Sequence, residues 1–359
     1  MGGPVKREQI ARYRRQIMLG EVGQAGQQKL LDARVAVIGA GGLGSPALLY
    51  LAGAGVGHVL IIDDDVVDLS NLHRQVIHTT DGVGRPKAES AREAMLALNP
   101  SVTVSVAVER LTWSNALSLL EGYDMILDGS DNFETRHIAS WAAASLGVPH
   151  IWASILGFDA QLTVFHADHG PIYEDLFPTP PPAGSVPSCS QAGVLGPVVG
   201  VVGSSMAMEA LKLITGVGRP LIGRLGYYSS MDGTWEYIPV VGNPAVVEMV
   251  RAKEVVAGSV SGVGEALDVP RVASVPSGVA LVDVREPHEF AAYAIPGAVN
   301  VPLSTIRSGA VPDAVAAGEE VLVYCAAGVR SAQAVAILHE AGYGGMTSLD
   351  GGIEGWLDG

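Results

Sequence analysis

The sequence has 359 residues, 48% of them hydrophobic, which is enough for two domains that each bury a core. Its 37 acidic and 22 basic residues give a net charge of −15, which argues against a sequence-independent nucleic-acid binder, since such proteins neutralise phosphates with many cations. Its two cysteines, Cys189 and Cys325, cannot form a disulfide framework, so we expect free thiols and a reducing, cytoplasmic location without a signal peptide.

The first predicted elements form a strand–helix–strand unit. Residues 34–38 read RVAVI and residues 58–62 read HVLII, and both runs are rich in β-branched residues. Between them, Ser45 and Pro46 are a cap and a first-turn residue that open a helix. This order is typical of two parallel strands joined by a crossover helix, and it predicts an α/β fold.

A glycine-rich loop lies between the first strand and its helix. Residues 39–44 read GAGGLG and fit the pattern G-x-G-x-x-G, in which glycines let backbone N–H groups approach a phosphate at the helix N-terminus. Asp63 ends the second strand, where a ribose-binding acid is expected. These features indicate a nucleotide, and by themselves they leave both NAD(P) and ATP open.

The residues that follow Asp63 favour ATP. The segment DDDVVDLSNLHRQ carries Asn71, Arg74 and Gln75, and GRPKAES adds Lys87. An enzyme that cleaves between the α and β phosphates needs cations where charge develops, whereas hydride transfer does not. Each residue taken singly is better explained as a solvated turn or a helix surface. Their order behind a glycine loop favours a common site.

Asp131 is the candidate magnesium ligand. It lies in DGSDN, residues 128–132, directly after a predicted strand at 123–128, so it should reach the carboxyl edge of the sheet where ligands bind. Mg²⁺ is usually held by few carboxylates together with phosphate oxygens. The alternative is that Asp131 only caps the helix that follows.

The rest of the first domain alternates between strands and helices in the same way. Helices are expected at 86–98 and 132–146, strands at 102–108, 149–154 and 161–167, and a hairpin at 225–240. Residues 176–192 are rich in proline, carry Cys189 and predict irregular structure.

The apolar run at 193–214 could be mistaken for a membrane span. Glu209 and Lys212 interrupt it, and it lacks basic flanks and aromatic belts. We therefore expect a buried or dimer-interface helix and no membrane association.

Composition changes after the hairpin. Residues 246–264 predict a linker between a first domain at 1–245 and a second α/β domain at 265–359. In the second domain, Cys325 lies in CAAGVRS between a strand and a helix, where backbone N–H groups, the helix N-terminus and Arg330 would lower the pKa of the thiol. The alternative is a buried, unreactive cysteine at a strand end.

Five ordered motifs between about residues 11 and 240 resemble the MoeB/ThiF family of ubiquitin-like-protein activating enzymes. They are RYRRQIMLG, GAGGLGSPALLYLAGAGVG, DDDVVDLSNLHRQ, GRPKAESA and DGSDNFETR. The resemblance implies a Rossmann-like mixed-sheet domain that uses ATP and Mg²⁺ to adenylate the C-terminal glycine of a small sulfur-carrier protein. It implies a homodimer, because Arg15 in RYRRQ aligns with the arginine that acts in the partner's site, and an acyl-accepting thiol at Cys189.

The same resemblance assigns individual residues. The glycine loop should hold phosphates, Asp63 the ribose, and the polar residues after the second strand the triphosphate. The expected nucleotide-binding residues are Gly41, Gly42, Gly44, Asp63, Asp65, Asn71, Arg74, Gln75, Lys87, Asp131 and Asn132. The residues expected to act in catalysis are Arg15, Arg74, Lys87, Asp131, Cys189, Cys325 and Arg330, and Asp131 is also the expected metal ligand.

The sequence departs from the family at its structural zinc. Many members carry two CxxC pairs, and the matching positions here are Ile172 with Asp175 and Val246 with Met249. A chain with two cysteines cannot form a four-thiolate site. We therefore expect no structural zinc, with apolar packing in its place.

Residues 265–359 resemble a small α/β rhodanese domain through LVDVREPHEF, IPGAVNVPL, YCAAGVRS and LDGGIEGW. In that family the loop cysteine, here Cys325, carries a persulfide. Ala326 and Ala327 replace residues that are often polar or basic, and Ala294 replaces a frequent histidine. The sulfur donor therefore stays open between a cysteine desulfurase and thiosulfate.

Together the resemblances predict an adenylyltransferase and sulfurtransferase that converts the terminal Gly-Gly of a ubiquitin-like sulfur carrier into a thiocarboxylate. A Cys325 persulfide would attack the acyl-adenylate, and Cys189 would resolve the acyl disulfide or hold a thioester beforehand. An NAD(P) oxidoreductase with a sulfur-transfer appendage and a non-catalytic carrier-binding scaffold are the alternatives. The motif SNLHRQ with Lys87 argues against the first, and the full set of candidate catalytic residues against the second. Molybdopterin, thiamin, cysteine and tRNA thiolation all stay open as pathways.

Overall fold

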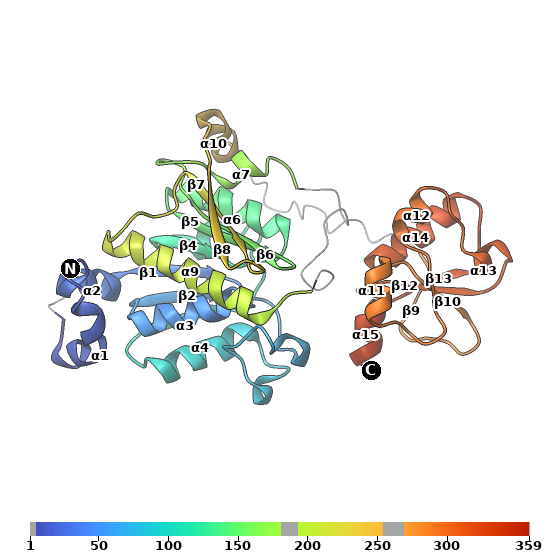
Figure 1. Ribbon diagram of the computed structural model, residues 1–359, viewed down its shortest axis with the longest axis horizontal. Coiled ribbons are helices and arrows are strands. Elements are labelled where there is room, and N and C mark those ends of the chain that lie inside the picture. Colours follow the sequence, from blue (N-terminus) through green and yellow to red (C-terminus); the bar gives the residue numbers. More distant parts are fainter. Residues whose placement is uncertain (1–4, 181–192, 254–268, 359) are drawn as a thin grey trace. The chain divides into compact units, whose positions relative to one another are not determined.

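The computed structural model describes residues 5–180, 193–253 and 269–358 (Figure 1). By its internal contacts the chain divides into two compact units, Met1–Gly258 and Ser259–Gly359. Each unit has a β-sheet with its own helices, so the predicted α/β class is confirmed for both.

An eight-stranded mixed sheet forms the centre of the first unit, in the order β3-β2-β1-β4-β5-β6-β7-β8. The first five strands in this order are parallel, and β6, β7 and β8 continue as antiparallel neighbours. Ile38 pairs with Ile62 on one side and with Asp128 on the other, which brings the carboxyl ends of β1, β2 and β4 level. The strands are β1 (Arg34–Ile38), β2 (His58–Ile62), β3 (Thr103–Ala107), β4 (Met125–Asp128), β5 (His150–Leu156), β6 (Asp159–Phe165), β7 (Arg224–Ser229) and β8 (Thr234–Pro239).

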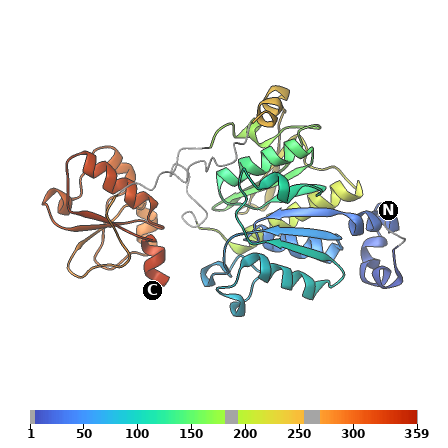
Figure 2. The same ribbon diagram turned by 180° about the vertical axis from the view of Figure 1, so that it is seen from behind.

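Helices cover both faces of this sheet (Figures 1 and 2). The helices α3 (Gly44–Ala54), α4 (Lys87–Leu98) and α9 (Gly196–Thr215) enclose a core with Val35 and Val37 of β1. On the other face, α5 (Ala116–Leu120) and α6 (Phe133–Leu146) enclose Ala36 and Ile38. Successive residues of a strand point to opposite faces, so the short apolar run of β1 supplies both cores. The remaining helices are α1 (Arg7–Ile17), α2 (Gly23–Asp32), α7 (Tyr173–Leu176) and α10 (Pro244–Arg251).

Among the described residues, α9 is the one helix long and apolar enough to cross a membrane. It packs tightly against the start of α3: a Cβ added to Gly203 would lie 2.3 Å from the Leu43 carbonyl oxygen. Val198, Val202 and Met206 are buried on the same side. This is the packing of a core helix, for which small residues allow close approach.

The segment expected to begin the linker contains α10. Asn243 caps this helix by accepting a hydrogen bond from the N–H of Ala245 at 3.0 Å. Val247 and Val250, three residues apart, are buried in the core that contains α6 residues. The helix therefore belongs to the first unit, although it extends beyond residue 245.

The second unit is built on a five-stranded parallel sheet, in the order β11-β10-β12-β13-β9. Val323 and Val335 lie in the core on one face, and Leu322, Tyr324 and Leu349 on the other. The elements are β9 (Arg271–Val272), β10 (Ala280–Asp283), α11 (Pro287–Ala292), β11 (Val299–Asn300), α12 (Leu303–Arg307), α13 (Asp313–Ala316), β12 (Val321–Tyr324), α14 (Val329–Glu340), β13 (Met346–Leu349) and α15 (Gly352–Asp358).

Candidate functional site

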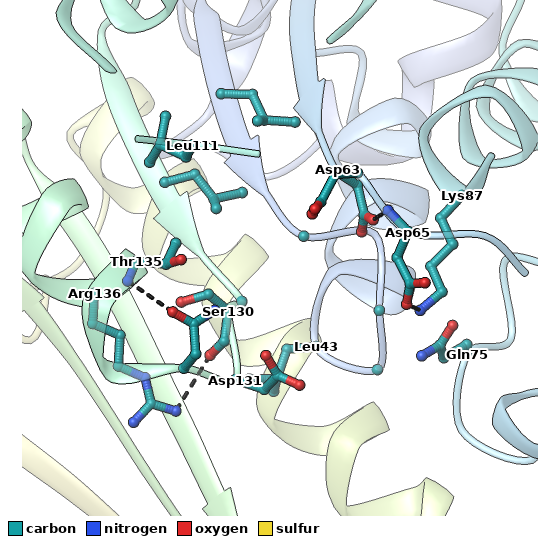
Figure 3. Close-up of a pocket in the computed structure, with 18 of the residues that line it drawn as sticks. Leu43, Asp63, Asp65, Gln75, Lys87, Leu111, Ser130, Asp131, Thr135 and Arg136 are labelled. Carbon is teal, nitrogen blue, oxygen red and sulfur yellow. Dashed lines mark hydrogen bonds and ion pairs between the residues drawn. The ribbon is translucent and has the colours of Figure 1, made fainter. Parts of the chain in front are cut away.

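A pocket of about 360 Å³ opens at the carboxyl ends of β1, β2 and β4 (Figure 3). β1 pairs with β2 on one side and with β4 on the other, so the connections leave it in opposite directions and a crevice forms between them. Most of the predicted nucleotide-binding residues line it, namely Gly41, Gly42, Asp63, Asp65, Arg74, Gln75, Lys87, Asp131 and Asn132. Gly44 and Asn71 lie outside the lining.

The glycine loop runs from the end of β1 to the start of α3 and forms one wall of the pocket. Gly41 and Gly42 face the cavity. Gly44 allows the two ends of the loop to pack closely, since a Cβ at this position would lie 2.0 Å from the Gly39 carbonyl oxygen. The Ser45 N–H (2.9 Å) and hydroxyl (2.7 Å) both donate to the Gly41 carbonyl oxygen. The Gly42 N–H, on the other side of that planar peptide, is thereby turned away from α3.

Asp63 lies at the end of β2, beside this loop. Its carboxylate accepts hydrogen bonds from the N–H of Ala40 at 2.7 Å and of Asp65 at 2.9 Å. Burial raises the pKa of Asp63 above its usual value, although these N–H groups and Lys87 act in the opposite direction. The carboxylate is thus held rigidly at the edge of the pocket, as a ribose ligand requires.

Two cations reach the pocket from the segment after β2. Lys87 is the first residue of α4, is only 5% exposed, and forms an ion pair with Asp65, whose side chain is 61% exposed. The Arg74 guanidinium donates to the Asn71 side-chain oxygen. Asn71 therefore orients Arg74 within this chain and does not itself line the cavity. Gln75 is buried, and its side-chain oxygen has no hydrogen-bond partner among the described residues.

The DGSDN segment brings Asp131 to the opposite side of the pocket (Figure 3). Its neighbour Asn132 is the N-cap of α6 and accepts a hydrogen bond from the N–H of Thr135 at 2.9 Å. The cap function therefore belongs to Asn132, which leaves the exposed Asp131 carboxylate free of that role.

Arg136 is a pocket residue that the sequence did not predict. It is buried, and its guanidinium donates to the Ser130 carbonyl oxygen at 3.3 Å and to the Ser154 hydroxyl at 3.2 Å. Among the described residues it has no carboxylate partner. The signal was its spacing: Arg136 follows Asn132 by four residues and so lies on the same face of the first turns of α6.

Arg15 is a further predicted residue that does not line this pocket. Arg15 is exposed on α1, and its neighbour Gln16 donates to the carbonyl oxygen of Ala54 at 3.0 Å, at the end of α3. The eleven residues of α3 span about 16 Å, so Arg15 lies near the far end of the helix from the glycine loop of its own chain. Cys189 lies outside the described residues.

The expected apolar packing at the positions that match the family's zinc ligands is found only in part: Ile172 is buried and Val246 is partly buried, but Met249 is 62% exposed. Ile172 is buried with Val247 and Val250 in one core. Asp175 accepts a hydrogen bond from the N–H of Ile172 at 2.8 Å and from the N–H of Asn243 at 3.0 Å, which ties the two segments together. No group of three or more His, Cys, Asp or Glu side chains suited to a metal occurs among the described residues.

In the second unit, Cys325 lies in the loop between β12 and α14 and is only 1% exposed. Its sulfur accepts a hydrogen bond from the N–H of Gly328 at 3.2 Å, and the Ser331 hydroxyl lies 3.6 Å away. Gly328 has a φ of 87°, which glycine adopts without strain and which turns its N–H toward the sulfur side of the loop. The sulfur therefore lies close to the N-terminus of α14, with this N–H directed at it.

Arg330, which was expected to add positive charge beside Cys325, is also paired with a carboxylate. Its guanidinium makes two hydrogen bonds to the Glu289 carboxylate, at 2.7 and 2.8 Å. The Arg330 guanidinium is therefore held in an ion pair with Glu289, in addition to its electrostatic interaction with Cys325.

The ThiF family matches residues 13–246, and a rhodanese-like domain matches residues 271–358. A probable adenylyltransferase/sulfurtransferase MoeZ of Mycobacterium tuberculosis is 44% identical over 98% of this chain and 94% of its own. The sulfur carrier protein adenylyltransferase of Thermus thermophilus is 49% identical over 66% of this chain and 90% of its own. Among solved structures, E. coli MccB with ATP has a TM-score of 0.58 at 22% identity and covers 65% of this chain and 72% of its own, which shows a shared fold.

Proposed function

The chain belongs to the ThiF family and carries a C-terminal rhodanese-like domain, and from this we propose that it adenylates a ubiquitin-like sulfur carrier and then sulfurates it. The observation that carries the proposal is the set of groups around one pocket: a glycine loop at a helix N-terminus, the half-buried Asp63 carboxylate at the end of β2, and basic side chains that include Lys87 and Arg74. A separate loop encloses a cysteine sulfur with a backbone N–H.

In the first reaction, a carboxylate oxygen of the carrier's terminal glycine attacks the α-phosphorus of ATP, and pyrophosphate leaves. The N–H groups of Gly41 and Gly42 and the side chains of Lys87 and Arg74 would stabilise the charge that develops on the phosphates. Activation is needed because a carboxylate is a poor electrophile and AMP is a good leaving group.

Asp131 is the proposed ligand of the Mg²⁺ that accompanies ATP. One carboxylate at the rim of a phosphate pocket fits this ion, which keeps several waters and takes its other ligands from the phosphates. When bound, Mg²⁺ would supply further neutralisation of the triphosphate. Because Asn132 caps α6, the Asp131 side chain can turn toward the cavity.

Arg136 is the proposed contact for the incoming carboxylate. It reaches the pocket on the Asp131 side, opposite Lys87 (Figure 3). A guanidinium without a carboxylate partner among the described residues is suited to bind a planar carboxylate with two hydrogen bonds. It would hold the carrier's terminal glycine near the α-phosphate while Lys87 and Arg74 bind the phosphates.

In the second reaction, the terminal sulfur of a Cys325 persulfide attacks the acyl carbon and AMP leaves, which gives an acyl disulfide. The thiolate of Cys189 would then attack the Cys325 sulfur, so that the carrier leaves as a thiocarboxylate and a Cys189–Cys325 disulfide remains. A cellular dithiol would reduce that disulfide. Alternatively, Cys189 would hold the acyl group as a thioester before the persulfide attacks. The persulfide would come from a cysteine desulfurase or from thiosulfate.

We also propose a homodimer and a cytoplasmic location. Arg15 is exposed and distant from the pocket of its own chain, so only a second subunit could bring such an arginine to the phosphates. The thiol chemistry requires a reducing compartment. The two alternatives, an NAD(P) oxidoreductase and a passive scaffold, are not favoured, because the relatives are named adenylyltransferases and sulfurtransferases.

The test uses both activities of the full-length enzyme. With a Gly-Gly carrier, the wild type should exchange radiolabelled pyrophosphate into ATP, and with thiosulfate and cyanide it should form thiocyanate. Asp131→Ala should lose exchange at least 100-fold and keep thiocyanate formation. Cys325→Ala should do the reverse and lose all thiocarboxylate product, as judged by the mass of the carrier. Near-native exchange by Asp131→Ala would remove it as the metal ligand.

A further inference from the structure

His78 is a buried imidazole that the proposed chemistry does not use. It lies between the cation-bearing segment and α4, and it is 6% exposed. Its Nε2 lies 2.9 Å from the carbonyl oxygen of Ala40 in the glycine loop, and its Nδ1 lies 2.9 Å from the Ser90 hydroxyl of α4. One side chain therefore connects the phosphate loop to the helix that begins with Lys87.

The two partners determine where the His78 proton lies. A carbonyl oxygen can only accept, so Nε2 carries the hydrogen and donates to Ala40. In the neutral ring Nδ1 then accepts from the Ser90 hydroxyl. Burial lowers the pKa of His78, and the nearby Lys87 charge lowers it further, so the ring is neutral at physiological pH.

The hydrogen bond to Ala40 has a consequence for the neighbouring residue. A trans peptide is planar, and its C=O and N–H point in opposite directions. No cis peptide occurs among the described residues. When His78 holds the Ala40 carbonyl on the interior side, the Gly41 N–H of the same peptide must point the other way, toward the pocket that Gly41 lines.

The Ala40 N–H is fixed independently by the Asp63 carboxylate at 2.7 Å. Both polar backbone groups of Ala40 are therefore tied to side chains, one from β2 and one from the His78 segment. No hydrogen-bond partner occurs among the described residues for the N–H groups of Gly41 and Gly42, which leaves both for a ligand. Consecutive N–H groups with one direction form an anion-binding concavity.

We propose that His78 is a positioning residue of the adenylation site: supported by Ser90, it orients the Ala40–Gly41 peptide so that the Gly41 N–H contacts the phosphates of ATP. The inference rests on the proposed function only in that the glycine loop binds phosphates. It requires neither the carrier nor the sulfur chemistry. Adenosine lacks phosphates, so its affinity is independent of this peptide.

The experiment compares His78→Met with His78→Gln in the full-length protein, by calorimetric titration with ATP–Mg²⁺ and with adenosine. Methionine has nearly the length of glutamine but no N–H, whereas the glutamine amide can still donate to Ala40. His78→Met should weaken ATP binding about tenfold and leave adenosine binding unchanged. His78→Gln should recover most of the loss, and Ser90→Ala should show a smaller loss of the same kind. With a Gly-Gly carrier, the exchange reaction should show the loss in KM for ATP more than in kcat.

Asn99→Leu is the matched control. Asn99 is a buried side chain at the far ends of α3 and α4, and it donates to the Ala52 carbonyl oxygen at 2.7 Å. Its loss should lower thermal stability without changing the ratio of ATP to adenosine affinity. The proposal would be overturned if His78→Met weakened ATP binding and adenosine binding equally. It would also be overturned if Asn99→Leu changed the ratio of ATP to adenosine affinity as much as His78→Met does. A wild type that binds ATP no more tightly than adenosine would overturn it too, whereas absence of pyrophosphate exchange alone would count against the proposed function.

Discussion

Two strand–loop–helix segments of this chain differ in how open their loops are and in how the nearby cations are paired. The glycine loop between β1 and α3 opens onto a pocket, where Lys87 is paired with a carboxylate that is mostly exposed. The loop between β12 and α14 closes around the Cys325 sulfur, and the nearby Arg330 is paired with the buried Glu289.

We relate this difference to the groups that the two loops contact. Under the proposed function, phosphates arrive and leave with each turnover, so their cations must be able to exchange an exposed partner for a ligand. The Cys325 sulfur is part of the chain, so an N–H group can contact it permanently, and a charged side chain nearby can serve the fold. We therefore expect Lys87 to bind a ligand and Arg330 to serve mainly as a structural ion pair.

Replacing Lys87, the cation whose partner carboxylate is exposed, should give the largest effect. Lys87→Met should lower kcat/KM for pyrophosphate exchange by about 100-fold or more, because a charge that develops in the transition state loses its partner. Thermal stability should change little, since Asp65 is left in contact with water. If exchange falls less than threefold, Lys87 does not bind the phosphates and the proposed difference between the two loops is wrong.

Replacing Arg330, the cation paired with the buried Glu289, should instead lower the stability of the second unit. Arg330→Met leaves the buried Glu289 carboxylate unpaired, and we expect a loss of about 3–5 kcal/mol of stability in the second unit. The double variant Arg330→Met with Glu289→Gln should recover much of it, as measured by hydrogen exchange of β12 peptides. Thiocyanate formation in the double variant decides the role of Arg330: retention within tenfold supports a structural pair, and complete loss restores a direct role at the sulfur.

The same pair predicts the acid sensitivity of the second unit. Burial alone would raise the pKa of Glu289, but the hydrogen bonds from Arg330 and the Glu286 N–H outweigh burial and hold the pKa below its usual value. A carboxyl group whose pKa is lower in the folded than in the unfolded state stabilises the fold above its unfolded pKa, and this contribution disappears as the pH falls through the folded pKa. Protection of β12 should therefore decline below about pH 4.5. Glu289→Gln should flatten that decline, and an unchanged slope would contradict it.

The smallest effect is expected where a side chain stands in for a metal cross-link. Asp175→Ala removes acceptors from the N–H groups of Ile172 and Asn243 and should cost the first unit about 1–3 kcal/mol. EDTA should leave the melting temperature of the wild type unchanged, with elemental analysis as the check. A fall of several degrees on chelation, with zinc near one per chain, would mean that a metal site has been missed.

The sequence predicted what depends on short-range pattern. Runs such as RVAVI and HVLII predict buried parallel strands. The glycine loop follows the first of these strands and Asp63 follows the second, so the strand ends determine where both lie. It did not predict interactions between distant residues. Glu289 is 41 positions from Arg330, and His78 is 38 from Ala40, so nothing in local spacing indicates either contact.

Individual side-chain roles were also hard to assign within a correct motif. The contact of Asn71 with the triphosphate stays a prediction; in the structure Asn71 accepts a hydrogen bond from Arg74, and Asn132 caps α6. Both are short polar side chains, and each forms a hydrogen bond with a group that is close to it in the chain. Arg136 was missed because helix composition alone does not reveal which face is turned to a pocket.

The burial of Cys325 also affects how readily this cysteine is oxidised. Oxidation of a cysteine beyond the sulfenic acid is irreversible for most proteins, and susceptibility depends on exposure as well as on thiolate character. A sulfur that is 1% exposed is accessible to peroxide in solution only when the surrounding loop opens. The enclosed loop therefore limits the access of dissolved oxidants to this sulfur while the second unit is folded.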